Sequence, residues 1–96
     1  MILVMVNADE LRKKQKEKKE KKIKTFEKIY GNLEKKIIMA SSSDYYYLWF
    51  EVPEYIIGQP FYKLYDCKEY LEKKLRENNF NTEFYDPNFL LVKWFE

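Results

Sequence analysis

The sequence predicts a small α+β protein in which a long charged N-terminal helix precedes a three-stranded antiparallel sheet with one packed helix, in the order α-β-α-β-β. Its 96 residues suffice for one domain. Residues 9–36 hold twelve Lys or Arg against six Asp or Glu, whereas sixteen of the eighteen aromatic residues follow residue 36. We therefore predict a charged helical arm, residues 1–36, joined to a compact aromatic-rich body, residues 37–96.

The first element is predicted to be a helix over residues 8–40. Asn7 is its expected N-cap, because an Asn side chain accepts a hydrogen bond from a free amide of the first turn, and Glu10 completes a capping box. Residues 12–22 contain no apolar side chain. A helical segment with nothing to bury is expected to project into solvent, supported by Glu–Lys pairs three or four residues apart.

The second half of this helix carries one apolar stripe. Its members follow at steps of three, four, three and four residues: Ile23, Phe26, Tyr30, Leu33 and Ile37. Such spacing places the side chains on one helical face, which therefore needs a surface to pack against. Gly31 predicts a bend or a close contact here, because Gly destabilises a helix by about 1 kcal/mol relative to Ala.

A strand is predicted over residues 45–52, where aromatic and β-branched residues dominate, and Pro53 ends it. Alternation separates two faces. One face holds Tyr46, Leu48, Phe50 and Val52, and the other holds Tyr45, Tyr47, Trp49 and Glu51. Residues 53–65 form a loop with a turn at residues 58–60, and the apolar side chains of this loop are expected to pack over the core.

The second helix is predicted over residues 66–78. Asp66 is its expected N-cap with Glu69 as capping-box partner, and Asn78-Asn79 can supply the left-handed residue that ends a helix. Its inner stripe comprises Cys67, Tyr70, Leu71, Lys74 and Leu75.

The last element is predicted to be a hairpin with strands over residues 80–85 and 89–95 and a turn at Asp86-Pro87-Asn88. One face of the sheet would meet Leu71 and Leu75 of the second helix. That face comprises Leu48, Phe50, Val52, Leu90, Val92 and Trp94.

The opposite face of the predicted sheet is too apolar to be left to water without a reason. It comprises Tyr45, Tyr47, Trp49, Phe89, Leu91 and Phe95. We expect the stripe of the first helix to dock there, because that stripe otherwise has no partner. The alternative is that another molecule covers this face.

The body carries five short runs that bear on its origin. They are Val52-Pro53-Glu54-Tyr55-Ile56-Ile57-Gly58-Gln59-Pro60, Tyr65-Asp66-Cys67, Asn78-Asn79-Phe80, Pro87-Asn88-Phe89-Leu90 and Val92-Lys93-Trp94. Over residues 30–96 the chain resembles short uncharacterised proteins of giant (nucleocytoplasmic large) DNA viruses. The resemblance implies a viral protein made in an infected eukaryotic cell, in the host cytoplasm or the virus factory, and it implies no activity and no site residues.

The composition argues against an enzyme. The chain has no His, which removes the commonest general base and metal ligand, and two Gly residues cannot build a phosphate-binding loop. Cys67 is alone, so we expect a buried thiol, no metal and no cofactor. A lone Cys fits a reducing, intracellular compartment. The apolar run of residues 1–6 is too short for a secretion signal or a membrane span.

The leading functional hypothesis is therefore a non-enzymatic accessory or adaptor protein that docks on a protein partner. The expected contact residues are Tyr45, Tyr47, Trp49, Phe89 and Lys93.

Nucleic-acid binding is the alternative, with possible base stacking on the aromatic sheet face. Its phosphate contacts would come from Lys13, Lys14, Lys16, Lys18, Lys19, Lys21 and Lys22. A third possibility is self-association as a short coiled coil. It would use the stripe of Ile23, Phe26, Tyr30, Leu33 and Ile37.

Overall fold

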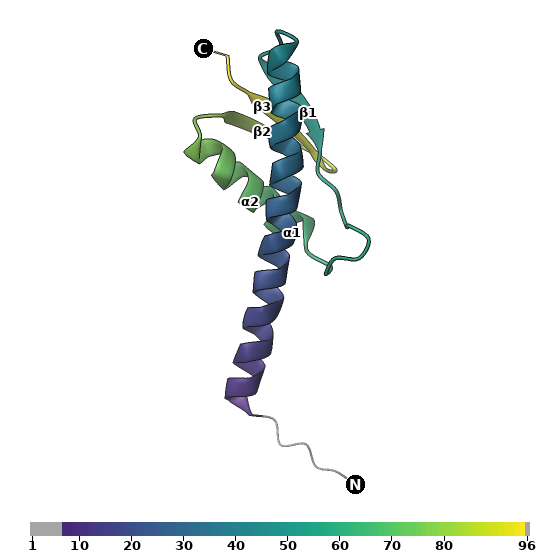
Figure 1. Ribbon diagram of the computed structural model, residues 1–96, viewed down its shortest axis with the longest axis vertical. Coiled ribbons are helices and arrows are strands. Elements are labelled where there is room, and N and C mark those ends of the chain that lie inside the picture. The colour runs from purple at the N-terminus through teal and green to yellow at the C-terminus, as the bar shows by residue number, and fades with distance from the viewer. Residues whose placement is uncertain (1–6, 96) are drawn as a thin grey trace.

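The computed structural model describes residues 7–95 and contains two helices and one three-stranded sheet (Figure 1). The elements are α1 (Ala8–Ser42), β1 (Tyr47–Glu51), α2 (Leu64–Glu77), β2 (Asn81–Tyr85) and β3 (Phe89–Lys93). This order confirms the predicted α+β class and element sequence. Residues 1–6, expected to carry no secretion signal, lie outside the described residues.

α1 begins where the sequence predicts. The side chain of Asn7 accepts a hydrogen bond from the amide of Asp9 at 2.8 Å, which satisfies one free donor of the first turn. The helix then continues through Gly31 without a break, and a methyl group at Gly31 would meet nothing within 4 Å. The expected bend or close contact at this residue is therefore wrong.

The sheet has the strand order β1-β3-β2, and both neighbouring pairs are antiparallel. Leu90 of β3 lies opposite Phe50 of β1 and Phe84 of β2, so these three residues form one row across the sheet. The predicted faces of β1 and β3 are confirmed, because Phe50, Leu90 and Val92 are buried while their sequence neighbours on the strands are more exposed.

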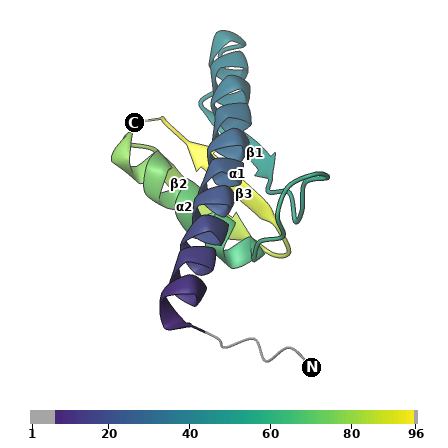
Figure 2. The same ribbon diagram turned by 60° about the horizontal axis from the view of Figure 1, so that its bottom comes forward.

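Both helices pack on this inner face of the sheet (Figures 1 and 2). α1 lies along β1, and α2 lies against β2. One core results, and it consists of Phe26, Ile29, Leu33, Ile37, Phe50, Val52, Tyr62, Cys67, Leu71, Leu75, Leu90 and Val92. The contact of Leu71 and Leu75 with the predicted inner face is thereby confirmed.

The expectation that α1 covers the aromatic face is wrong. The chain leaves α1 through a tight turn, in which the amide of Tyr45 donates to the carbonyl of Ala40 at 3.0 Å, and β1 returns alongside the helix. The apolar stripe of α1 therefore meets the inner side chains of β1. α2 has only 14 residues, so a second helix is needed to close the inner face.

The buried stripe of α1 also differs in detail from the predicted one. Ile23 is exposed and Tyr30 is partly buried, whereas Thr25 and Ile29 are buried. The boundary predicted at residue 36 falls inside α1, and residues 25–33 on its N-terminal side contribute to the core. The N-terminal part of α1 extends beyond the body (Figure 1), and residues 8–21 are all exposed.

α2 begins at Leu64 with Lys63 as N-cap, so Asp66 lies in the first turn and is not the N-cap. The helix ends as predicted, because Asn79 adopts a left-handed conformation with φ of 66°. The preceding loop packs only in part. Tyr62 is buried and Ile56 is half-buried, whereas Ile57 is exposed.

The loop is tied to α1 by polar and aromatic contacts. The Thr25 hydroxyl donates to the Gln59 side chain at 3.2 Å, and the Tyr62 hydroxyl donates to the carbonyl of Pro53. The ring of Tyr62 meets Phe26 edge-on with centroids 5.3 Å apart. These contacts hold the loop to the body at Gln59 and Tyr62, whereas Tyr55, Ile57 and Phe61 remain exposed.

Candidate docking surface

The outer face of the sheet is open because both helices lie on the other side. Tyr45, Tyr47, Trp49 and Phe89 remain 54 %, 46 %, 52 % and 40 % exposed. The docking hypothesis would have failed if these side chains were buried within one molecule, and they are not. We call this surface the aromatic face and define it by Tyr45, Tyr47, Trp49, Tyr85 and Phe89.

The aromatic face is ordered by contacts between its own rings. Trp49 of β1 and Tyr85 of β2 lie on either side of β3, and their ring centroids are 5.4 Å apart above the central strand. Tyr45 meets Tyr47 edge-on at 6.0 Å. Edge-on and tilted pairs at these separations are favourable. Two ring pairs therefore lie on this face, and one of them reaches from β1 to β2 across the central strand.

Lys93 is the cation predicted at this face, and it is already paired. Its ammonium lies 3.2 Å from one carboxylate oxygen of Glu83, and the Tyr85 hydroxyl donates to the other oxygen at 3.1 Å. The hydrogen bonds from Lys93 and Tyr85 lower the pKa of Glu83. The bond to Glu83 in turn raises the pKa of Tyr85. Lys93 thus neutralises a carboxylate and is not free to hold a phosphate.

These features favour a protein over a nucleic acid at this face. Exposed Tyr, Trp and Phe are the residues that contribute most at protein interfaces, because large rigid rings lose little conformational entropy on binding. Base stacking would need free cations beside the rings. Here the outward-facing residues include the carboxylates of Glu51 and Glu83, which repel phosphate.

The structure brings together on one face four of the predicted contact residues, Tyr47, Trp49, Phe89 and Lys93, and places Tyr45 at its rim beside Tyr47. Sequence reasoning missed Tyr85, which contacts Trp49. Alternation within residues 81–85 would have placed Tyr85 on the outer face. Its meeting with Trp49 depends on β3 lying between β1 and β2, which the sequence leaves open.

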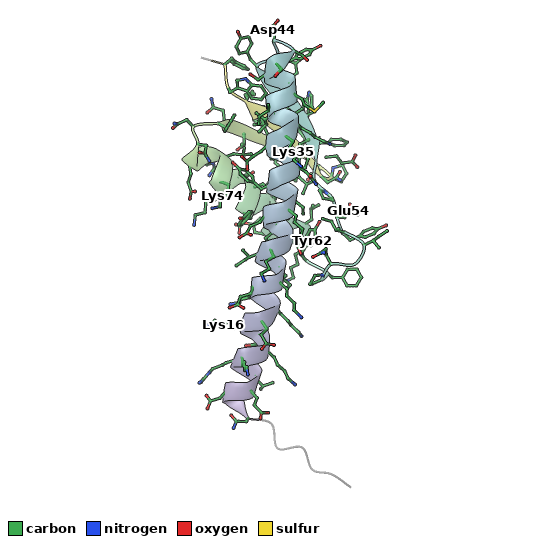
Figure 3. The ribbon with its side chains drawn as sticks, viewed as in Figure 1. Lys16, Lys35, Asp44, Glu54, Tyr62 and Lys74 are labelled. Carbon is green, nitrogen blue, oxygen red and sulfur yellow. The ribbon has the colours of Figure 1, made fainter. Side chains whose placement is uncertain are left out.

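The lysine-rich part of α1 forms a second, separate surface. Every residue from 8 to 21 is exposed, and among the described residues the one ion pair there joins Arg12 and Asp9 at 3.3 Å. Figure 3 shows Lys16 on this projecting segment, away from the body. At about 100° per residue the predicted phosphate-binding lysines point all round the helix. They are Lys13, Lys14, Lys16, Lys18, Lys19, Lys21 and Lys22.

The stripe proposed for self-association is not available as a whole. Phe26, Leu33 and Ile37 are buried in the core of the same molecule, so α1 cannot pair along this stripe while the body is folded. Cys67 is fully buried, and burial raises its pKa to about 12. Within residues 7–95 no group of His, Cys, Asp or Glu could hold a metal ion, and no helix is long and apolar enough to cross a membrane.

Comparison with known proteins gives a family and a viral relative. Residues 6–76 match the model of a family of unknown function, DUF5759. The chain is 32 % identical over 95 residues to an uncharacterised protein of Acanthamoeba polyphaga mimivirus. The aligned residues make up 95 % of this chain and 77 % of the relative. No solved structure is significantly similar. The resemblance to uncharacterised giant-virus proteins is thereby confirmed.

Proposed function

Because the chain belongs to the DUF5759 family, whose function is unknown, its role has to be inferred from its own surface, and we propose that it is a non-enzymatic viral adaptor that docks on a protein partner. The docking residues are Tyr45, Tyr47, Trp49, Phe89 and Lys93, joined by Tyr85.

One observation carries this proposal. Both helices cover the inner face of the sheet, and the outer face is left with two pairs of exposed rings and with Phe89. Large exposed apolar patches are rare on monomers that have no partner, since each exposed ring forgoes the free energy of burial. The core lies entirely on the inner face of the sheet, so the aromatic residues on the outer face are not needed to build it.

The partner surface is expected to be apolar, with a polar rim. The rings offer hydrophobic contact, and the Lys93–Glu83 pair beside them is neutral as a unit. A partner that added a cation or an anion at this point would have to compete with the existing ion pair. Charge therefore contributes little to recognition at the centre of this face.

Site-specific photo-crosslinking in infected host cells tests the proposal. A benzophenone amino acid replaces Phe89 in one variant and Tyr47 in a second. In a third variant, which serves as the control, it replaces Tyr65, an exposed aromatic residue on α2. We expect positions 47 and 89 to crosslink to the same protein and position 65 not to do so.

A second pair of variants makes the test specific. Trp49→Ala should remove the crosslink from position 89, because truncating an aromatic anchor weakens binding by about 2 kcal/mol or more. Tyr65→Ala should leave it unchanged. Crosslinks that are equally strong from all three positions, or that survive Trp49→Ala, would contradict docking through the aromatic face.

Nucleic-acid binding by α1 is the second candidate, and a specific observation favours it. Residues 8–21 extend beyond the body, and every lysine among them is exposed and outside any ion pair with a described residue. Counterion release on contact with phosphates would supply the affinity. The acids Asp9, Glu10, Glu17 and Glu20 on the same segment reduce its net charge.

A further inference from the structure

β1 is an edge strand that pairs on one side only. The sheet order leaves β3 as its one neighbouring strand. The amide of Trp94 donates to the carbonyl of Tyr46 at 3.0 Å, and the amide of Val52 donates to the carbonyl of Asn88 at 2.8 Å. In an antiparallel pair, hydrogen-bonded and non-hydrogen-bonded positions alternate along each strand. The even-numbered residues of β1 are therefore the ones bonded to β3.

The odd-numbered residues of β1 direct their backbone groups the other way. The N–H and C=O groups of Tyr47, Trp49 and Glu51 point to the free edge of the sheet. Their side chains lie on the outer face, and those of Tyr47 and Trp49 belong to the aromatic face. Unpaired donors and acceptors along an edge are a template for another strand.

α1 runs beside β1 (Figure 1), and the hollows between the helix and this strand form a groove. The groove contains two apolar hollows. One of about 420 Å³ lies between Met39 and Ala40 of α1 and Leu48 and Trp49 of β1. The other, of about 370 Å³, lies between Ile29 and Asn32 of α1 and Phe50 of β1, with Ile56 at its end. Lys36 lines both hollows, so they adjoin along the strand.

The helical wall of the groove is basic. Lys35 and Lys36 project from α1 at its centre, and neither forms an ion pair with a described residue. The ammonium of Lys36 lies over the ring of Phe50, 5.3 Å from its centroid, which holds it at the floor of the groove. One carboxylate, that of Glu51 on β1, lines the second hollow, and none lines the first, so the two lysines leave the lining of the groove with a net positive charge. A negatively charged side chain would therefore be favoured at the centre of the groove.

The opposite edge of the sheet is formed by β2, which packs against α2. The ammonium of Lys68 of α2 lies over the ring of Phe84 on β2, 4.1 Å from its centroid. Lys68 is therefore placed at the β2 edge much as Lys36 is placed at the β1 edge. At the β1 edge, two apolar hollows adjoin the free backbone groups of the strand.

We propose that the groove between α1 and β1 binds an extended segment of the partner protein as an added strand. That segment has apolar side chains at alternate positions, which fill the two hollows, and a carboxylate between them, which pairs with Lys35 and Lys36. Backbone hydrogen bonds supply affinity in this mode, and pockets for alternate side chains supply specificity. The inference rests on the proposed docking function and specifies the form of the partner, whose outward side chains would extend the aromatic face beside Tyr47 and Trp49.

The experiment begins with a display library of random linear peptides, selected on the full-length protein. We expect the enriched sequences to share alternating apolar residues around an Asp or Glu. The best peptide, labelled with fluorescein, is then titrated by fluorescence polarisation. A peptide with Lys in place of the acidic residue should bind about tenfold more weakly or worse, since a charge-assisted contact is lost.

Paired variants locate the bound peptide. Glu51→Pro removes an outward-facing amide without removing a bond to β3, whereas Glu51→Ala makes the same change of charge and keeps the amide. We expect Glu51→Pro alone to weaken binding severalfold. Reversing both Lys35 and Lys36 to Glu should also weaken binding, and the same reversal of Lys16 and Lys18, on the projecting part of α1, should not.

Amide hydrogen exchange supplies a direct readout of strand addition. On peptide binding the amides of Tyr47, Trp49 and Glu51 should exchange at least about tenfold more slowly, because they acquire acceptors. The amides of Leu48 and Phe50, which already bond to β3, should change little. Unchanged exchange at the odd-numbered positions, or equal binding by Glu51→Pro and Glu51→Ala, would overturn the proposal.

The remaining outcomes separate this inference from the docking function. If the selected peptides lose binding in Phe89→Ala but not in Glu51→Pro, the aromatic face docks a partner and strand addition is wrong. If no linear peptide is enriched, strand addition is also wrong, and docking of a folded partner is judged by the crosslinks. If neither set of variants nor the crosslinks responds, both proposals fail.

Discussion

At the scale of single residues, Cys67 and Tyr62 show how the core treats ionisable groups. Cys67 is fully buried and Tyr62 is nearly so. Loss of water around the charged forms raises the pKa of both side chains to about 12, and the nearby Cys67 adds to the shift of Tyr62. Neither group is placed for chemistry, because each is held in its neutral form well above neutral pH.

These shifts predict alkaline destabilisation. Both groups are protonated near neutral pH in the folded and unfolded chain, so they contribute nothing to pH dependence there. Above pH 9.0, the ordinary pKa of a thiol, the unfolded chain releases the Cys67 proton while the folded chain retains it. The free energy of unfolding should therefore fall as pH rises towards 12, by about 1.4 kcal/mol per pH unit for each group.

Urea unfolding at a series of alkaline pH values measures this effect. Cys67→Ala should be less stable near neutral pH, because it leaves a cavity, yet its stability should fall less steeply above pH 9. Tyr62→Phe should likewise reduce the slope above the ordinary tyrosine pKa of 10.0. Slopes that are the same in all three proteins would show that these groups are not responsible.

At the scale of elements, α1 has two parts with different physical roles. Residues 8–21 are exposed and are supported by the Asn7 cap and the Arg12–Asp9 ion pair, whereas residues 25–37 are held by packing on β1 and α2. The two parts form one helix, so the projecting part begins from a turn that is already fixed. A helix that starts from a packed turn needs no separate nucleation.

Gly31 gives a prediction for this element. The helix passes through this residue without a break, and an added methyl group would meet nothing within 4 Å. Gly31→Ala should therefore raise the free energy of unfolding by about 0.5 to 1 kcal/mol, because Ala restricts the unfolded chain and favours the helix. Thermal and urea unfolding measure the change.

The matched control is Gly58→Ala. Gly58 has a φ of 83°, a conformation that strains any residue with a Cβ, so this substitution should destabilise the protein although the site is equally open. A destabilising effect of Gly31→Ala would show that Gly31 has a structural role not visible in its surroundings.

At the scale of the whole molecule, the protein is elongated. Its principal extents are 66 × 25 × 22 Å, and its radius of gyration is 17.4 Å. A compact domain of this length would have a radius of gyration of about 12 to 13 Å. The difference arises from the projecting part of α1 (Figure 2). The docking surface and the lysine-rich segment are therefore separate, and one molecule can use both.

The second candidate function, nucleic-acid binding by the projecting part of α1, gives a prediction at this scale. We expect weak binding of labelled single-stranded RNA and duplex DNA at low salt, and loss of about a hundredfold in affinity between 50 and 200 mM salt if roughly four phosphates are neutralised. Reversal of Lys13, Lys16 and Lys18 to Glu should abolish this binding. Substitution of Glu for Lys63, the N-cap residue of α2, and for Lys73, within α2, should leave this binding unchanged.

Fluorescence polarisation measures these affinities. No binding at low salt would eliminate the nucleic-acid candidate and leave protein docking as the proposed function. Binding that persists at 200 mM salt, or that survives the substitutions in α1, would mean that base contacts on another surface contribute.

Much of the fold could be predicted because local patterns fix local structure. Asn7 marks the start of α1, and alternation along residues 45–52 and 89–95 gives the two faces of β1 and β3. The same alternation identified Tyr47, Trp49 and Phe89 as one candidate surface before their exposure was known. These predictions succeed because the period of a strand or helix is set by its own backbone.

The sequence by itself determined the element order, the faces of the strands and the separation of charge from aromatic residues. Only the tertiary structure decided that α1 shares the inner face with α2, that Ile29 and not Ile23 is buried, and that Tyr85 meets Trp49 across β3. Periodicity states which side chains share a face, but it carries no information about which face of another element they meet. That choice depends on the short turn after α1 and on strand order, which arise from packing of the whole chain.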